Sequence, residues 1–131
     1  MLRGMTTVSY YADDLTAAAR WYSEILETEP YFEVPGYIEF RIGDYQHELG
    51  IIDRRYAPGG PASPGGALLY WHVDDVRESL ARLLAHGATE YQPVTERGEG
   101  FVTASAVDPF GNIVGVMSNR HYLDVLANRP A

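Results

Sequence analysis

Proton transfer and cation binding are the two kinds of chemistry that the residue types of this chain suggest. His72 lies in an aromatic and apolar run, and an unperturbed imidazole titrates near neutral pH. It would serve as a ligand contact, a general base or a lone metal donor; the alternative is a hydrogen-bonded structural histidine. Glu39 and Glu48 would attract a cationic ligand, and Arg41 between them would pair with either carboxylate. The alternative for these carboxylates is a solvated strand face.

Several other chemistries are excluded by composition. The chain has no cysteine, and all ten of its basic residues are arginine, so thiolate and lysine Schiff-base mechanisms are ruled out. His47 and Glu48 are adjacent and would point to opposite faces of a strand, so they cannot chelate one metal together. No motif pairs a nucleophile with a base.

Length, composition and net charge limit the kinds of partner that the protein could bind. A length of 131 residues with 46% hydrophobic residues fits one packed domain. A net charge of −8 argues against nucleic acid and mildly favours a cationic partner. No apolar run approaches the roughly 20 residues that span a bilayer, and Met1 to Thr7 lacks a signal-peptide core. We therefore expect no membrane association and a cytoplasmic location.

A duplicated pattern organises the chain. Residues 7–15 and 68–76 superpose at an offset of 61, each a β-branched and aromatic run that ends in Asp-Asp. An amphipathic helix is predicted after each pair, and Asp75 is a good N-cap with Glu78 at capping-box spacing. Gly87 is the expected C-cap of the second helix.

Three short strands are predicted after each helix. Turn residues separate the predicted strands, which span residues 31–34, 37–42 and 47–52 in the first half and 89–94, 101–107 and 113–118 in the second. We predict a single domain, residues 1–131, with a first module at 5–53, a linker at 54–66, a second module at 67–119 and a tail at 120–131. The linker region is rich in proline and glycine, and a short helix is expected at 121–127.

The fold class follows from the duplication. One helix on one face of a four-stranded sheet cannot close a core alone, whereas two such units side by side can bury their helix-facing sides. We therefore predict an α+β fold of two βαβββ modules that form a cupped mixed sheet with helices on the outer face.

The ordered motifs resemble those of the glyoxalase, bleomycin-resistance and extradiol-dioxygenase superfamily, also called vicinal oxygen chelate proteins. The resemblance rests on the doubled strand–Asp-Asp–helix pattern and on Asp108-Pro109-Phe110-Gly111-Asn112 before the last strand. It implies a ligand cup, and it implies a homodimer because related proteins often build the cup from two chains.

The resemblance also implies where a metal would bind. Metal-dependent relatives carry ligands at positions that correspond here to Thr7, Gly50, Leu68 and Gly115, or to Glu48 in place of Gly50 if the alignment slips by two. This set lacks the N, O or S donors that a divalent cation needs. It resembles the metal-free branch, so no metal and no other cofactor is predicted.

Strand alternation then predicts the lining of the cup. Paired glycines at its floor would make room for a flat ligand, or would relieve crowding over a bend. The predicted ligand-binding residues are Tyr11, Tyr37, Glu39, Arg41, Glu48, Gly50, Tyr70, His72, Gly115 and Met117.

Three functions remain open from the sequence. The first is a metal-free protein that binds a planar aromatic or cationic small molecule, with antibiotic sequestration as one role. The second is a lyase, isomerase or dioxygenase-type enzyme that uses His72 or Glu48, or a metal at shifted positions. The third is a structural or regulatory dimer.

Overall fold

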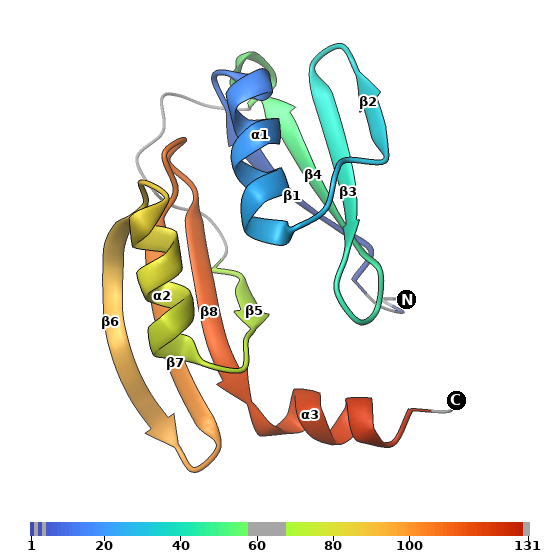
Figure 1. The fold of residues 1–131 in the computed structure, drawn as a ribbon. Coiled ribbons are helices and arrows are strands. Elements are labelled where there is room, and N and C mark those ends of the chain that lie inside the picture. The colour runs from blue at the N-terminus through green and yellow to red at the C-terminus, as the bar shows by residue number, and fades with distance from the viewer. Residues whose placement is uncertain (2, 4, 58–67, 130–131) are drawn as a thin grey trace. The chain divides into compact units, whose positions relative to one another are not determined.

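Each half of the chain forms a four-stranded sheet with one helix packed on it. The structure is a computed structural model that describes residues 1, 3, 5–57 and 68–129, and the chain divides into the units Met1–Ala62 and Ser63–Ala131. The first unit contains β1 (Thr7–Ala12), α1 (Leu15–Leu26), β2 (Phe32–Val34), β3 (Tyr37–Ile42), β4 (His47–Asp53) and η1 (Arg54–Tyr56). The second contains β5 (Tyr70–His72), α2 (Val76–Ala85), β6 (Thr89–Gly98), β7 (Phe101–Val107), β8 (Ile113–Asn119) and α3 (Arg120–Ala127). This order confirms the predicted pair of βαβββ modules (Figure 1).

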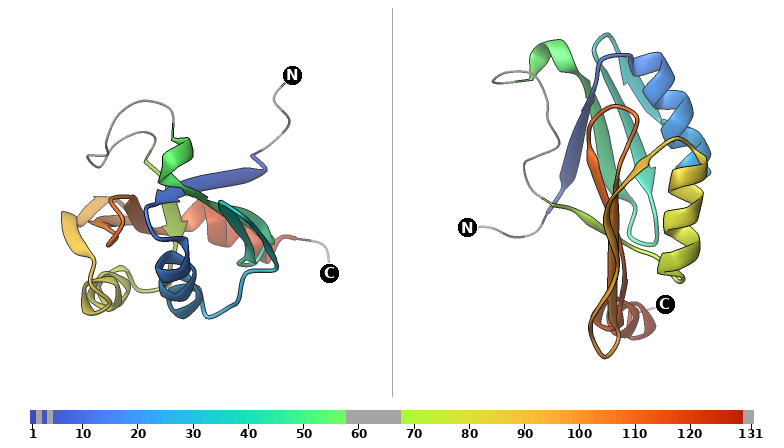
Figure 2. Two further views of the ribbon diagram at one scale, coloured as in Figure 1. Left: turned by 90° about the horizontal axis from the view of Figure 1, so that it is seen from above. Right: turned by 90° about the vertical axis from the view of Figure 1, so that its left-hand side faces the viewer.

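The two sheets share one topology. Their strand orders are β1-β4-β3-β2 and β5-β8-β7-β6. In each sheet the first strand pairs in parallel with the last, and the remaining pairs are antiparallel. A parallel pair requires a long crossover connection, which here includes the helix. The helix of each unit lies on one face of its own sheet (Figure 2).

Both helices begin at the second aspartate of the Asp-Asp pair. The Asp14 carboxylate accepts a hydrogen bond from the Ala17 backbone N–H, and Asp75 accepts one from Glu78, each at 3.0 Å. The predicted N-cap at Asp75 is therefore confirmed. Gly87 follows α2 with φ of 95°, a left-handed conformation that suits glycine at a helix end.

The core of each unit lies between helix and sheet. In the first unit the helix-facing side chains include Trp21 and Tyr22 on α1 and Phe40, Leu49 and Ile51 on the sheet, all buried. In the second, Leu80 and Leu83 of α2 are buried, as are the small and branched residues Ala104, Ala106, Val114 and Val116. Burial of each large apolar side chain contributes about 1.5–3 kcal/mol. Because side chains alternate along a strand, this core fixes which residues lie on the opposite face, here called the open face.

Several elements differ from their predicted bounds. β2 begins one residue late, at Phe32, and β4 and β8 each end one residue late, at Asp53 and Asn119. β5 begins at Tyr70, so Leu68 precedes the strand. β6 extends to Gly98 rather than ending at Val94, because it is an edge strand whose register shifts accommodate Pro93. The predicted linker begins with a 3-10 turn at Arg54–Tyr56, which is capped by the Asp53 carboxylate, and its residues 58–66 lie outside the described part of the chain. The terminal helix begins one residue early, at Arg120, because the Asn119 side chain caps it.

The turn before β8 depends on one buried carboxylate. Asp108 is 4% exposed, and its side chain accepts hydrogen bonds from the backbone N–H groups of Phe110 and Asn112 at 2.9 and 2.7 Å and from the Asn112 amide at 2.8 Å. These bonds close the turn that carries the chain from β7 into β8. Removing a buried acceptor of this kind breaks all three hydrogen bonds at once.

Asp108→Ala should therefore lower the free energy of unfolding by about 1.5–3 kcal/mol, the range for hydrogen bonds to charged groups. Urea unfolding followed by circular dichroism would measure this loss. Asp74→Ala serves as the control, because its side chain is 99% exposed, and surface changes usually stay within about 0.5 kcal/mol. Equal effects of the two substitutions would contradict the assigned role of Asp108.

Candidate functional site

The open face of the first sheet carries a regular grid of polar and aromatic residues. Strand pairing brings together three cross-strand rows, Thr7–Glu48–Arg41, Ser9–Gly50–Glu39 and Tyr11–Ile52–Tyr37. The predicted ligand residues of this module, Tyr11, Tyr37, Glu39, Arg41, Glu48 and Gly50, therefore share one face. On the opposite face Ile38, Phe40 and Ile42 are buried.

Glu39 lies at the centre of this grid and is held by two phenols. The Tyr31 and Tyr37 hydroxyls each donate a hydrogen bond to it, one to each carboxylate oxygen. Tyr31 precedes β2 and is 46% exposed, and its hydroxyl also lies 3.4 Å from Glu48 Oε2. Tyr31 thus joins the two carboxylates, and both remain close enough to act on one cation.

Glu48 is held by a hydroxyl and a guanidinium. Thr7 Oγ1 donates to Glu48 Oε1 at 3.1 Å, and Arg41 Nη2 and Nε lie 3.2 and 3.3 Å from Oε2. The Arg41 side chain is 54% exposed and that of Glu48 is 31% exposed, so this ion pair contributes little to stability. Arg41 Cζ also lies 4.3 Å from the centroid of the Tyr31 ring, a cation–π contact.

The pKa values of two groups on this face are shifted. Partial burial, and then the negative charge of Glu48, raise the pKa of Glu39 above its ordinary 4.5, while Arg41 opposes the rise. The same two causes raise the pKa of Tyr37 above 10.0. Since one guanidinium faces two carboxylates, the site favours an additional positive charge.

The paired glycines are covered by tyrosine rings of the protein itself. A Cβ on Gly50 would lie 2.7 Å from two ring carbons of Tyr37, and one on Gly115 would lie 2.5 Å from the Leu69 carbonyl oxygen and 2.7 Å from a Tyr70 ring carbon. Of the sequence alternatives, a bare floor for a flat ligand and relief of crowding, this geometry favours relief of crowding. An aromatic ring packed across a strand glycine stabilises a sheet.

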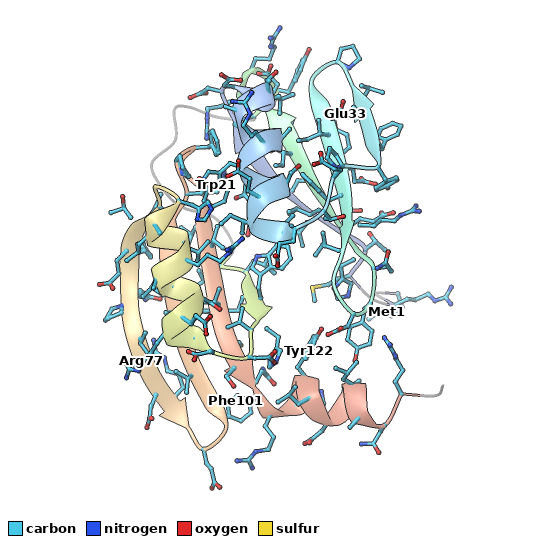
Figure 3. All side chains as sticks on the ribbon, viewed as in Figure 1. Met1, Trp21, Glu33, Arg77, Phe101 and Tyr122 are labelled. Atoms are coloured by element: carbon cyan, nitrogen blue, oxygen red, sulfur yellow. The ribbon has the colours of Figure 1, made fainter. Side chains whose placement is uncertain are left out.

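His72 in the second unit is packed inside the protein. Its side chain is 9% exposed, and its ring stacks on Tyr122 of α3 with centroids 4.5 Å apart and planes 10° apart. His72 Nδ1 accepts the Asn119 backbone N–H at 3.2 Å, so the neutral ring carries its proton on Nε2. Among the described residues Nε2 has no hydrogen-bond partner, with Asp74 Oδ1 3.7 Å away. Figure 3 labels Tyr122, whose side chain extends from α3 towards β5.

The remaining predicted residues of this module share the open face of the second sheet. Tyr70 pairs with Gly115 and His72 with Met117, while Ser105 and Thr103 of β7 continue the same two rows. Both β7 residues are buried, and their hydroxyls contact Gln92 and Arg97 of β6 at 3.4 and 3.1 Å.

Sequence analysis missed the residues that approach the open faces from outside the central strands. Tyr31 was assigned to a strand, but its position before β2 lets the ring reach the central carboxylates. Tyr122 lies in the predicted tail and Asn119 is the last residue of the predicted second module, and neither is among the predicted site residues, although both contact His72. Neither position carries a motif, and only the aromatic residue type hinted at a role.

The four positions where the family places metal ligands do not fit a metal. The Thr7 hydroxyl is engaged by Glu48, the two glycines are covered by tyrosine rings, and Leu68 has no donor side chain. Within the described residues no three His, Cys, Asp or Glu side chains gather as a metal site would require. Glu48, the alternative position, lies beside Glu39, and in the part of the chain that the structure describes no third donor of this kind joins them. Two carboxylates are fewer than a divalent cation usually requires.

Two shallow surface depressions lie away from these faces. One, of about 370 Å³, is bounded by α1, Glu29, Pro30 and Glu33. The other, of about 430 Å³, lies along α3 beside Val125 and Asn128. Neither contains a predicted ligand residue. None of the described helices is long and apolar enough to span a membrane.

Two βαβββ units, each with one covered and one open sheet face, define a paired-module α+β protein. The chain belongs to the glyoxalase/bleomycin resistance protein/dioxygenase superfamily, whose family model matches residues 4–116. This confirms the family that the sequence motifs suggested. No curated protein matches the chain.

Solved structures share the fold at low sequence identity. A solution structure of an Agrobacterium tumefaciens protein has a TM-score of 0.76 at 23% identity, covering 90% of this chain and 98% of that one. A lactoylglutathione lyase from the same organism has a TM-score of 0.66 at 24% identity, covering 87% and 92%. A bleomycin resistance determinant encoded on transposon Tn5 has a TM-score of 0.66 at 21% identity, covering 90% and 99%. These likenesses establish the fold.

The glycine contacts predict unequal costs of substitution. Gly115→Ala should destabilise the protein by about 1–3 kcal/mol, because its Cβ would meet a backbone carbonyl that cannot move freely. Gly50→Ala should cost less, because the phenol end of Tyr37 can swing aside. Urea unfolding of both variants would measure the difference.

A double-mutant cycle tests the tyrosine contact itself. In a Tyr37→Ala background the Gly50→Ala substitution should become nearly neutral, because the ring that blocks the Cβ is gone. Strictly additive effects of the two substitutions would show that the ring does not pack on Gly50.

Proposed function

We propose that this chain is a metal-free small-molecule binding protein that takes a planar aromatic or cationic ligand on its open sheet faces. Its proposed role is to sequester such compounds, which include antibiotics. Tyr11, Tyr37, Glu39, Arg41, Glu48 and Gly50 would provide the contacts of the first module, and Tyr70, His72, Gly115 and Met117 those of the second.

The observation that carries this proposal is the pair of carboxylates, Glu39 and Glu48, joined by the Tyr31 hydroxyl. Burial, and then repulsion from Glu48, raise the pKa of Glu39, and a cation at this position would relieve the repulsion. The phenol rings would supply π faces for a flat ligand. The net charge of −8 would favour approach of a cation over that of an anion.

The alternative is an enzyme, and one observation favours it. His72 Nε2 is buried and lacks a hydrogen-bond partner within the described residues, which would suit a group that transfers a proton to a substrate. Against this, Tyr122 covers the ring and Asn119 engages Nδ1, as expected of a structural histidine. A lactoylglutathione lyase is among the structural neighbours, but the metal positions here lack the donors for that type of chemistry. The homodimer and the cytoplasmic location expected earlier remain predictions.

Glu39→Gln should weaken the binding of a planar aromatic cation such as berberine. Loss of one charge-assisted contact costs about 1.5–3 kcal/mol, which corresponds to roughly a tenfold to hundredfold rise in Kd. Isothermal titration calorimetry of the full chain with berberine, and separately with bleomycin, would measure it.

Glu33→Gln is the matched control. Glu33 pairs with Ile38, so it lies on the face of the same sheet opposite to Glu39, and its substitution removes the same charge. The control variant should bind berberine as the unmodified chain does. Equal weakening in both variants, or binding of neither compound to the unmodified chain, would contradict the proposed site.

Cation binding should also depend on pH through Glu39. The ionised carboxylate attracts a cation and the protonated one does not, so affinity should be greatest above the Glu39 pKa and fall as pH is lowered through it. Because that pKa is raised, the loss should begin above the 4.5 of an ordinary glutamate. The pH profile of berberine affinity should flatten in Glu39→Gln, and an unchanged profile would assign the pH dependence to another group.

A further inference from the structure

Arg41 already makes the contacts that a planar cationic group would make at the proposed site. Its guanidinium lies over the face of the Tyr31 ring, with Cζ 4.3 Å from the centroid. Its nitrogens reach Glu48 Oε2 at 3.2 and 3.3 Å. An aromatic face on one side and a carboxylate at the edge are the two features that recognise a flat, delocalised cation.

The hold on Arg41 is weak. Both of its contacts go to a single oxygen of Glu48, because Thr7 engages the other, so the two-oxygen fork that makes arginine pairs strong is not formed. The side chain is 54% exposed, and ion pairs with that exposure stabilise proteins little. Arg41 can therefore leave the Tyr31 face at small cost.

The net charge of Glu39, Glu48 and Arg41 also favours the binding of a further cation. Two carboxylates face one guanidinium, and Glu39 is satisfied by phenol hydroxyls rather than by a cation. These neutral donors leave the negative charge of Glu39 uncompensated, so an incoming cation would be attracted by both carboxylates while Arg41 swings into solvent.

We infer that Arg41 is a displaceable stand-in for the ligand, and that the site selects a guanidinium or amidinium group over a tetrahedral ammonium. This inference rests on the proposed function and adds the chemical class of the ligand. The incoming group replaces Arg41 over Tyr31 and against Glu48, so the arginine acts as an internal competitor that sets the affinity.

Benzamidine and benzylamine form a matched pair of probes. The first carries a flat, delocalised cation and the second a tetrahedral ammonium, on the same ring. Calorimetric titration of the unmodified chain should show tighter binding of benzamidine. Arg41→Met, which keeps an apolar stem but removes the competing cation, should tighten benzamidine binding by about two- to fivefold, the range that corresponds to loss of an exposed ion pair.

Control variants separate this effect from general electrostatics. Arg77→Met removes the same charge from an exposed position on α2 and should leave both affinities unchanged. Arg41→Gln provides a second test if Arg41→Met does not fold. It should also tighten benzamidine binding. In the Arg41→Met background Tyr31→Leu should abolish the preference for benzamidine, whereas Tyr31→Phe should keep it because the aromatic face remains.

The outcomes distinguish this inference from the proposed function. If the probes bind and Glu39→Gln weakens them, but Arg41→Met does not tighten benzamidine or benzylamine binds equally well, the stand-in role of Arg41 is wrong and the binding site stands. If neither probe, berberine nor bleomycin binds any variant, the proposed function itself fails, and the inference with it.

Discussion

One-sided burial is the constraint on which both units depend. A single amphipathic helix covers one face of a four-stranded sheet, and large apolar side chains such as Phe40 and Ile51 fill the space between them. Because alternate residues of a strand point to opposite faces, packing Ile38, Phe40 and Ile42 against the helix places Tyr37, Glu39 and Arg41 on the open face. The candidate site is thus positioned by the core, and a slip of one residue in register would exchange the two sets.

Gly50 and Gly115 allow tyrosine rings to pack on the open faces of the two sheets. At Gly50 and Gly115, where metal-dependent relatives are expected to carry ligands, the absence of a side chain lets a tyrosine ring pack directly on the sheet. At Gly50 that packing has a second effect, because it brings the Tyr37 hydroxyl to the Glu39 carboxylate. Glycine at position 50 therefore creates a place for the ring that holds the central carboxylate.

The sequence was sufficient to predict the elements but not the contacts between them. Turn residues predicted the bounds of β3 and β7, and the Asp-Asp pairs located both helix starts, since these signals are local. The predicted length of β6 was wrong. A proline such as Pro93 is tolerated within a strand at the edge of a sheet, and the edge position of β6 is a property of the whole sheet. The contacts of Tyr31 with Glu39 and of Tyr122 with His72 join residues from different elements, so no local pattern could reveal them.

Duplication left the two open faces with different chemistry. In the first unit two carboxylates and a weakly held guanidinium remain partly exposed, so the guanidinium can leave the face at little cost. In the second unit β8 runs into α3, and Tyr122 from that helix covers His72. Burial there limits access of water to the imidazole and keeps its Nδ1 engaged by the Asn119 backbone. The same strand arrangement thus carries a partly exposed arginine–glutamate pair in one module and a covered histidine in the other. The difference lies in the side chain that packs over each open face.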